Sequence, residues 1–493
     1  MKRGIKALSA SCLFLAAALL SCGEAAAPAN TPDTLSVTAE NAAETEPAET
    51  RVQHQVPVDT LDFGGAEYRS DYPDWQGYRY YFFASDENGD VMNDAIWART
   101  RRIEEALNVK FVNTVHDTIL TVISDTKPLI LAGEDFAEAV YLHCLSGVAT
   151  FTSEGYLTDI DGLPYIDLNA DWWNKTQMDA LRLGKNTYYA IGDYMIPCPY
   201  LVYFNKKLVE ELDFDDPYEL VFSGKWTLDR MTEMARLAKA DLNGDGKMTD
   251  ADRYGIAANE ISKYNSFVTG SGQFLTAKNA ENKLELAVNT PKMQSLVERF
   301  AALAKENVCY LPTADDYSID GVNIDTGKLM FQLAAISTAE SYREYTTDFG
   351  FLPYPKYDEA QENYISLDWG GLMGVPVTAQ NHELCGAVME LLAYESAAEV
   401  IPTYYNTVLT GKLSRDENAV KVLDIVFDTI TYEPGGNYFG SGDLGDLFYC
   451  LPRLAVKEMS TDFASWYKKN EKKANKAFEK FYTALDAAEN ADG

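Results

Sequence analysis

Residues 188–207 have the sequence YYAIGDYMIPCPYLVYFNKK, which contains two extended segments, Tyr188–Ile191 and Leu201–Phe204. Pro197 and Pro199 lie between them. Each proline lacks an N–H and restricts the residue before it, so the two segments are poor partners for regular strand pairing. The pattern predicts a crossing between two α/β lobes, with a helix starting directly after the second segment.

The length and composition of the chain agree with two lobes. A chain of 493 residues is too long for one ordinary core, and 46% hydrophobic residues indicate a globular protein. We expect one lobe over 61–197 with 366–395, and the other over 198–365 with 396–490. The net charge of −33 would repel nucleic acid and anionic lipid, so neither is an expected partner.

The first 60 residues are predicted to be a targeting segment and a tether. A basic start precedes an apolar run of 14 residues, Ala7–Leu20, whereas a membrane-spanning helix needs roughly 20. Residues 1–21 therefore resemble a signal peptide, and Cys22 stands where a bacterial lipoprotein is cleaved and lipidated. The alternative is an ordinary signal peptide with a chance cysteine. Residues 22–60 are rich in Ala, Glu, Thr and Pro, which predicts a disordered acidic tether.

The cysteines and histidines argue against several kinds of site. Without Cys12 and Cys22, five cysteines remain, an odd number with wide and irregular spacing. They form neither a disulfide framework nor a CxxC metal site, and most are expected to be buried. Only four histidines are present, which disfavours a transition-metal centre.

Polar residues follow a predicted strand of the first lobe. Strands are expected at Tyr78–Ala84 and Ala139–Leu142, the second of them followed by His143 and Ser146. Ligands of open α/β sheets bind beyond the carboxyl ends of strands, so His143 and Ser146 are candidate cleft residues. For His143, a hydrogen-bonded loop histidine is an equally good interpretation.

Tryptophans supply the candidate stacking groups. Trp172 and Trp173 stand together between Asp171 and Asn174, and Trp369 precedes two glycines. A sugar ring has an apolar C–H face that stacks on an indole, so Trp173 and Trp369 are candidate ligand contacts. Core packing, or packing between the lobes, is the alternative for each of them.

The stretch Asp241–Asp252 matches a calcium-loop pattern. Oxygen-bearing side chains stand at positions 1, 3 and 5, glycine at 6, a backbone carbonyl at 7 and a carboxylate at 12. The predicted Ca²⁺ ligands are Asp241, Asn243, Asp245, Lys247 and Asp252. The segment after the loop looks extended, which predicts a structural calcium site and not a helix–loop–helix sensor. The alternative is an Asx-rich surface loop that needs no ion.

Several weak motifs, taken in order, resemble the bacterial extracellular solute-binding proteins of family 1, the sugar-binding lipoproteins of ABC importers. The motifs are the cysteine at 22, Asn93–Ile96, Gly155–Ile160, Tyr203–Lys206, Gly224–Thr227, the calcium-like loop, Gly327–Lys328, Trp369–Gly371, and a final group from Tyr404 through Leu409 and Lys412 to Glu417.

This resemblance implies an α/β, two-lobed periplasmic-binding-protein type II fold with an interlobe ligand cleft and a helical C-terminus. It places the loop His143–Ser146, the crossing near Cys198, the rim near Tyr342 and the segment at Trp369 against the ligand. The crossing of such proteins often carries a carboxylate, whereas Cys198 stands there in this sequence, so Asp193 and Glu340 are the candidates to supply the carboxylate.

The resemblance also implies how the protein works. It would be a lipid-anchored monomer on the outer face of the cell membrane, which captures a carbohydrate, most simply an oligosaccharide, and delivers it to an ABC permease without chemistry.

Two other functions stay open from the sequence. An extracellular glycoside hydrolase would need two carboxylates about 5–9 Å apart, and no signature marks such a pair. A calcium-stabilised surface protein that binds a macromolecular partner is the other alternative.

Overall fold

The computed structural model describes residues 52–75, 78, 82–312, 319–410 and 417–491, with the side chains of 340, 343, 408–410 and 491 left out. The predicted signal peptide, Cys22 and the tether up to residue 51 lie outside these residues. Within the described residues, no helix combines the length and apolar character needed to cross a membrane.

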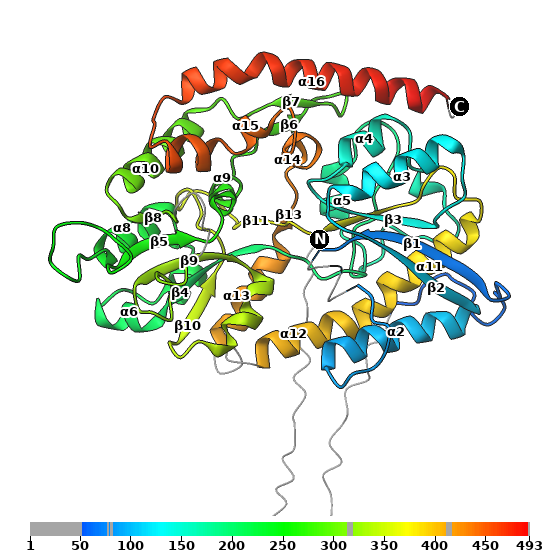
Figure 1. Cartoon of the computed structure of the whole chain (residues 1–493), viewed down its shortest axis with the longest axis horizontal. Coiled ribbons are helices and arrows are strands. Elements are labelled where there is room, and N and C mark those ends of the chain that lie inside the picture. The colour runs from blue at the N-terminus through cyan, green and yellow to red at the C-terminus, as the bar shows by residue number, and fades with distance from the viewer. Residues whose placement is uncertain (1–51, 76–77, 79–81, 313–318, 411–416, 492–493) are drawn as a thin grey trace, which may run out of the picture. The chain divides into compact units, whose positions relative to one another are not determined.

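The first lobe contains a four-stranded sheet in the order β12-β3-β1-β2, of which Figure 1 labels β3, β1 and β2. The strands β1, β2 and β3 run parallel, and β12 pairs antiparallel with β3. Their bounds are Ala66–Pro73 for β1, Val109–His116 for β2, Ala139–His143 for β3 and Gly371–Gly374 for β12. Strand β12 comes from much later in the chain, so two segments build this lobe.

The second lobe contains a five-stranded sheet in the order β10-β4-β9-β5-β8. Strands β9, β5 and β8 are parallel, and β4 runs antiparallel between β9 and β10. Their bounds are Tyr200–Asn205 for β4, Tyr254–Ala258 for β5, Cys309–Tyr310 for β8, Leu329–Ala335 for β9 and Phe349–Leu352 for β10. A small hairpin, β6 (Thr276–Lys278) with β7 (Leu284–Leu286), stands apart from this sheet.

Helix α2 shows how local sequence determines where a helix of the first lobe begins and ends. Asp90 caps its start by accepting from the N–H groups of Met92 and Asn93, and Asn108 ends it at a left-handed φ of 49°. The other helices of this lobe and its return segment are α3 (Thr121–Ala132), α4 (Val148–Ser153), η1 (Ile160–Gly162), α5 (Lys175–Leu181) and α11 (His382–Glu395), and α2 spans Val91–Leu107.

Local sequence also determines where the helices of the second lobe begin, as helix α8 shows. Helix α8 begins after Thr227, whose hydroxyl accepts from the N–H of Arg230. The helices are α6 (Lys206–Glu211), α7 (Pro217–Phe222), α8 (Leu228–Ala238), η2 (Ile261–Asn265), α9 (Ser266–Gly270), α10 (Pro291–Lys305) and η3 (Ile336–Glu344).

Two crossings between the lobes touch each other. Pro199, in the segment just before β4, forms an isolated β-bridge with Asp368. Asp368 follows the short strand β11 (Ser366–Leu367), which pairs with β13 (Ile430–Thr431). The predicted crossing at Pro197–Pro199 is thus present, and it enters β4 as the sequence indicated.

The C-terminal quarter is helical, as predicted. Its elements are η4 (Ser396–Val400), α12 (Ile401–Thr410), α13 (Glu417–Asp428), α14 (Pro434–Phe439), α15 (Gly445–Phe448), η6 (Leu451–Lys457) and α16 (Phe463–Ala491). Helix α12 packs on α2, and α16 packs on α4 of the first lobe as well as on β7 and α10 (Figure 1). Residues 396–490 therefore contact both lobes, although the sequence assigned them to the second.

Two sequence-based boundaries need correction. The first strand is Ala66–Pro73, whereas the described residues of the predicted strand Tyr78–Ala84 form no strand: Tyr78 is helical, Phe82 lies in a turn, and residues 83 and 84 have no regular structure. The predicted tether also ends too late. Val56 is only 4% exposed and the ring of His54 meets Tyr394 edge-on, so the folded body includes residues that were assigned to the tether.

Candidate functional site

A cavity of about 410 Å³ is lined by residues from both lobes and from the crossings. In the first lobe its lining follows the carboxyl ends of β1, β2 and β3, and in the second it follows the carboxyl ends of β5 and β9. The described lining residues are Trp75, Ile119, His143, Leu145, Ile196, Pro197, Cys198, Tyr200, Asn259, Glu260, Ser262, Lys263, Ala335, Ser337, Thr338, Trp369, Tyr404 and Tyr449. This is the position at which open α/β sheets bind ligands.

His143 is the last residue of β3 and is held as a neutral hydrogen-bond donor. Burial lowers its pKa to about 4, so the ring is uncharged near neutral pH. Its Nδ1 accepts from the N–H of Leu145 at 3.2 Å, which leaves the ring proton on Nε2. Trp75 meets the ring edge-on, with 4.7 Å between the ring centroids.

Trp369 borders the cavity from the second crossing. It stacks on Tyr200, with ring centroids 5.0 Å apart and planes 22° apart, and Phe448 covers it from another direction. Only 5% of Trp369 is exposed. The residue therefore forms part of the cavity wall and also packs on Tyr200 and Phe448, as the packing alternative expects, whereas its contact with a ligand stays a prediction.

Asp368 joins the two crossings to the first lobe. Its Oδ1 accepts from the N–H groups of Cys198 at 2.8 Å and Gly370 at 3.0 Å, and its Oδ2 accepts from Gln177 Nε2 at 2.8 Å. Burial raises the pKa of this carboxyl, and these hydrogen bonds act against that rise. Cys198 and Trp369, its neighbours, both line the cavity, so Asp368 positions the cavity wall.

Lys263 and Glu260 are the charged residues that the second lobe contributes to the described cavity lining. Both follow β5, where Lys263 lies in η2, and the distance from Lys263 Nζ to Glu260 Oε2 is 3.3 Å. Glu260 is the one carboxylate among the described lining residues. A glycosidase pair of carboxylates is therefore not found in this part of the cavity wall.

The other predicted ligand contacts lie outside the cavity lining that the structure describes. Ser146 is buried in a turn in which its N–H donates to the carbonyl of His143. The N–H of Asp193 donates to the carbonyl of Trp172. Tyr342 accepts from Gln332 Nε2 and stacks on Tyr345, one turn beyond Thr338. The side chain of Glu340 is not among the described ones.

Trp173 lies in the core of the first lobe. It is 1% exposed, and its Nε1 donates to Glu390 Oε2 at 2.9 Å, while Trp172 Nε1 donates to Glu390 Oε1 at 3.1 Å. The position matches the packing alternative for this pair. Of the seven predicted contacts, the structure brings His143 and Trp369 together at the cavity.

Trp75, Tyr200, Tyr449 and Lys263 were not among the predicted contacts. A weak signal existed for two of them, because Trp75 follows the carboxyl end of β1 and Lys263 follows that of β5. The rule that pointed to His143 applies to these two, but not to Tyr200, which is the first residue of β4.

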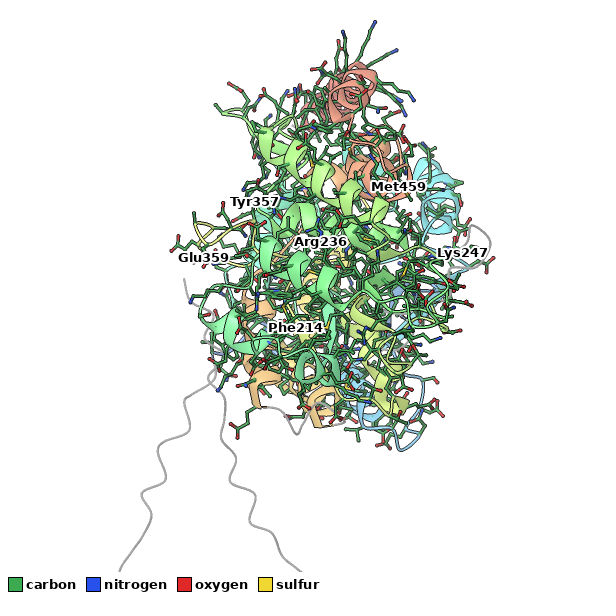
Figure 2. The ribbon with its side chains drawn as sticks, turned by 90° about the vertical axis from the view of Figure 1, so that its left-hand side faces the viewer. Phe214, Arg236, Lys247, Tyr357, Glu359 and Met459 are labelled. Atoms are coloured by element: carbon green, nitrogen blue, oxygen red, sulfur yellow. The ribbon has the colours of Figure 1, made fainter. Side chains whose placement is uncertain are left out.

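The calcium-like loop lies at the opposite end of β5 from the cavity. A bridge between Ala240 and Arg253 closes its base, and Figure 2 shows Lys247 at the margin of the second lobe, away from Arg236 on α8. Gly246 has a φ of +78°, as the expected sharp turn requires.

The carboxylates of this loop face backbone N–H groups. Asp252 accepts from Leu242 and Thr249, and Asp241 accepts from Gly244 and Gly246. No cluster of three or more His, Cys, Asp or Glu side chains that could hold a metal occurs in the described part of the chain. The loop is thus held by hydrogen bonds from its own backbone N–H groups, and a calcium ion in it stays a prediction.

Comparison with known proteins identifies the fold. No protein-family model matches the sequence, and no curated protein matches it. Solved structures do match. One is the galacto-N-biose-/lacto-N-biose I-binding protein of an ABC transporter from Bifidobacterium longum, solved with lacto-N-biose. It has a TM-score of 0.59 and 12% identity, over 86% of this chain and 99% of that chain.

Two further matches are of the same kind. An ABC substrate-binding protein from Listeria monocytogenes, solved with cycloalternan, has a TM-score of 0.55 and 12% identity, over 84% of this chain and 99% of its own. The cyclic α-maltosyl-1,6-maltose binding protein from Arthrobacter globiformis has a TM-score of 0.54 and 11% identity, over 86% and 99% of the two chains. The chain has the fold of ABC sugar-binding proteins. The solute-binding fold predicted from the weak motifs, with two lobes and a helical C-terminus, is thereby confirmed.

Proposed function

We propose that this protein is the substrate-binding component of an ABC importer and that it captures a carbohydrate. The observation that carries the proposal is the cavity lined by both lobes. It combines aromatic side chains with a fixed N–H donor, in a fold whose solved relatives include proteins in complex with saccharides. Glycoside hydrolysis uses a pair of carboxylates, and Glu260 is the one carboxylate among the described lining residues. We therefore propose binding without hydrolysis.

The function would rest on a shift between two states. A ligand that contacts both lobes binds the closed arrangement more tightly than an open one, so it increases the population of the closed state by that difference in affinity. His143 belongs to one lobe and Lys263 to the other. A ligand could therefore touch both residues only when the lobes are closed. A permease would then recognise the closed, monomeric protein.

Removing the tryptophans of the cavity tests the proposal. Trp369→Ala should weaken saccharide binding, measured by calorimetry on the purified full chain, by up to about tenfold, since an aromatic contact contributes about 0.5–1.5 kcal/mol. Trp369 also packs on Tyr200, so Trp75→Ala, at a half-buried position, serves as a second variant. Trp97→Ala, outside the cavity lining, is the control. Equal affinities for all four chains would contradict the proposal.

We further propose that the chain is anchored outside the cell by a lipid on Cys22, followed by a tether. This rests on the sequence of the first 51 residues alone. Cys22→Ser should move the protein from the membrane fraction to the medium, and retention of that variant in the membrane would count against the anchor.

A calcium ion in the loop Asp241–Asp252 is a proposal from the sequence pattern alone. A ligand that binds only the folded state raises the melting temperature. Millimolar Ca²⁺ should therefore raise the melting temperature of the full chain over that in chelator, and Asp245→Ala should abolish the increase. An unchanged melting temperature in Ca²⁺, Mg²⁺ and chelator would contradict the calcium site. The loop would then be a surface turn that is held by its own Asx hydrogen bonds alone.

A further inference from the structure

Lys263 places an incompletely compensated positive charge in the cavity wall. Its side chain is 7% exposed, whereas that of its partner Glu260 is 58% exposed. The oxygen that faces Lys263, Oε2 of Glu260, also accepts from Ser262 at 3.3 Å. Water screens a carboxylate this exposed and weakens its hold on the ammonium group. Burial accordingly lowers the pKa of Lys263, and Glu260 only partly opposes that change.

The ammonium group stands beside the aromatic wall. Lys263 Nζ lies 5.1 Å from the ring centroid of Tyr200, and Tyr200 stacks on Trp369. A sugar ring against this wall would have a cation next to it. A neutral sugar offers hydroxyl, ring and glycosidic oxygens but no charge to pair with this cation.

The fixed polar groups of the cavity are mainly donors. Lys263 has three N–H groups and no acceptor, and His143 presents Nε2–H because its Nδ1 is occupied by Leu145. Glu260 is the one lining side chain, among those described, that only accepts. Such a lining suits a ligand with strong acceptors. Hydrogen bonds to an ionised acceptor are roughly twice as strong as neutral ones.

The rest of the molecule does not attract anions. The chain carries a net charge of −33, so a general surface potential cannot account for anion binding, and a local cation is required. Among the described lining residues, Lys263 is that cation.

Building on the proposed function, we propose that the cargo is an acidic saccharide, in which a sugar unit carries a carboxylate. Lys263 would bind this carboxylate and His143 Nε2–H would donate to it. Two donors match the two oxygens of a carboxylate. Because the donors belong to different lobes, this group would be bound by both only in the closed state.

Matched ligands and matched variants test the proposal on the purified full chain. The ligands are dimers and trimers of galacturonic, glucuronic and mannuronic acid, each compared by calorimetry with its carboxyl-reduced neutral counterpart and with a sulfated disaccharide. Lys263→Met removes the charge, and Lys263→Arg keeps it. Lys356→Met is the control, because Lys356 is also buried and lies over a tyrosine, Tyr364, but is outside the described cavity lining.

We expect at least one acidic saccharide to bind about 30-fold or more tightly than its neutral counterpart. Lys263→Met should remove most of that difference, whereas Lys263→Arg and Lys356→Met should retain it. Preference for a neutral or sulfated saccharide, or a preference for the acid that Lys263→Met does not alter, would overturn this inference and leave the proposed function intact. Absence of binding to every saccharide would overturn both.

Discussion

Replacing Asp368 with alanine should lower the free energy of unfolding by about 3 kcal/mol or more. The carboxylate is 3% exposed and accepts from three donors, the N–H groups of Cys198 and Gly370 and the side chain of Gln177. Each buried donor left without an acceptor costs about 1–3 kcal/mol. The loss would fall on both crossings at once, since one carries Cys198 and the other carries Asp368 itself.

Asp368→Asn is the matched control for this prediction. The asparagine oxygen can keep the two backbone donors, and its NH₂ group can face Gln177, whose amide can rotate to present its oxygen. We expect this variant to lie within about 1 kcal/mol of the unchanged chain in urea unfolding. An alanine variant as stable as the asparagine variant would show that the carboxylate does not hold the crossings together.

Raising the pH from 5 to 8 should destabilise the folded protein through Glu390. Burial raises the pKa of Glu390 to about 7, from an ordinary value of 4.5, although hydrogen bonds from Trp173 and Trp172 oppose this rise. Between these values the folded chain holds a proton that the unfolded chain has released, so stability falls as the pH rises through this window. The full effect is about 3 kcal/mol, from about 1.4 kcal/mol per pKa unit.

Glu390→Gln isolates this contribution from other groups. Burial also raises the pKa of Glu433 to about 7, so the unchanged chain has more than one source of pH dependence. Glutamine cannot ionise, and its NH₂ group meets one of the two indole N–H donors. We therefore expect a variant that is less stable at pH 5 but whose stability falls less steeply up to pH 8. Parallel profiles for the two chains would contradict a titrating Glu390.

Local sequence predicted the elements whose partners are close in the chain. Two prolines marked the crossing before β4, and the strand-end rule placed His143 at the cavity. The strand β1 was missed because it carries polar residues that are partnered in the fold. Arg69 of β1, for example, pairs with Glu138.

Distant partners decided the positions that local sequence could not predict. Trp173 is a core residue because Glu390, 217 residues later, accepts from its indole. Lys263 belongs to the cavity because Tyr200 lies beside it and stacks on Trp369. No motif in the sequence around Lys263 predicts these neighbours. Pairings of this kind are fixed only when distant segments of the chain fold together.

Solution scattering of the full chain during a saccharide titration tests the central claim most directly. If the protein is a capture receptor with this two-lobed fold, one saccharide class should bind saturably, decrease the radius of gyration as the lobes close, and be recovered chemically unchanged. Release of shorter saccharides, or saturable binding with no change in the radius of gyration, would contradict that claim.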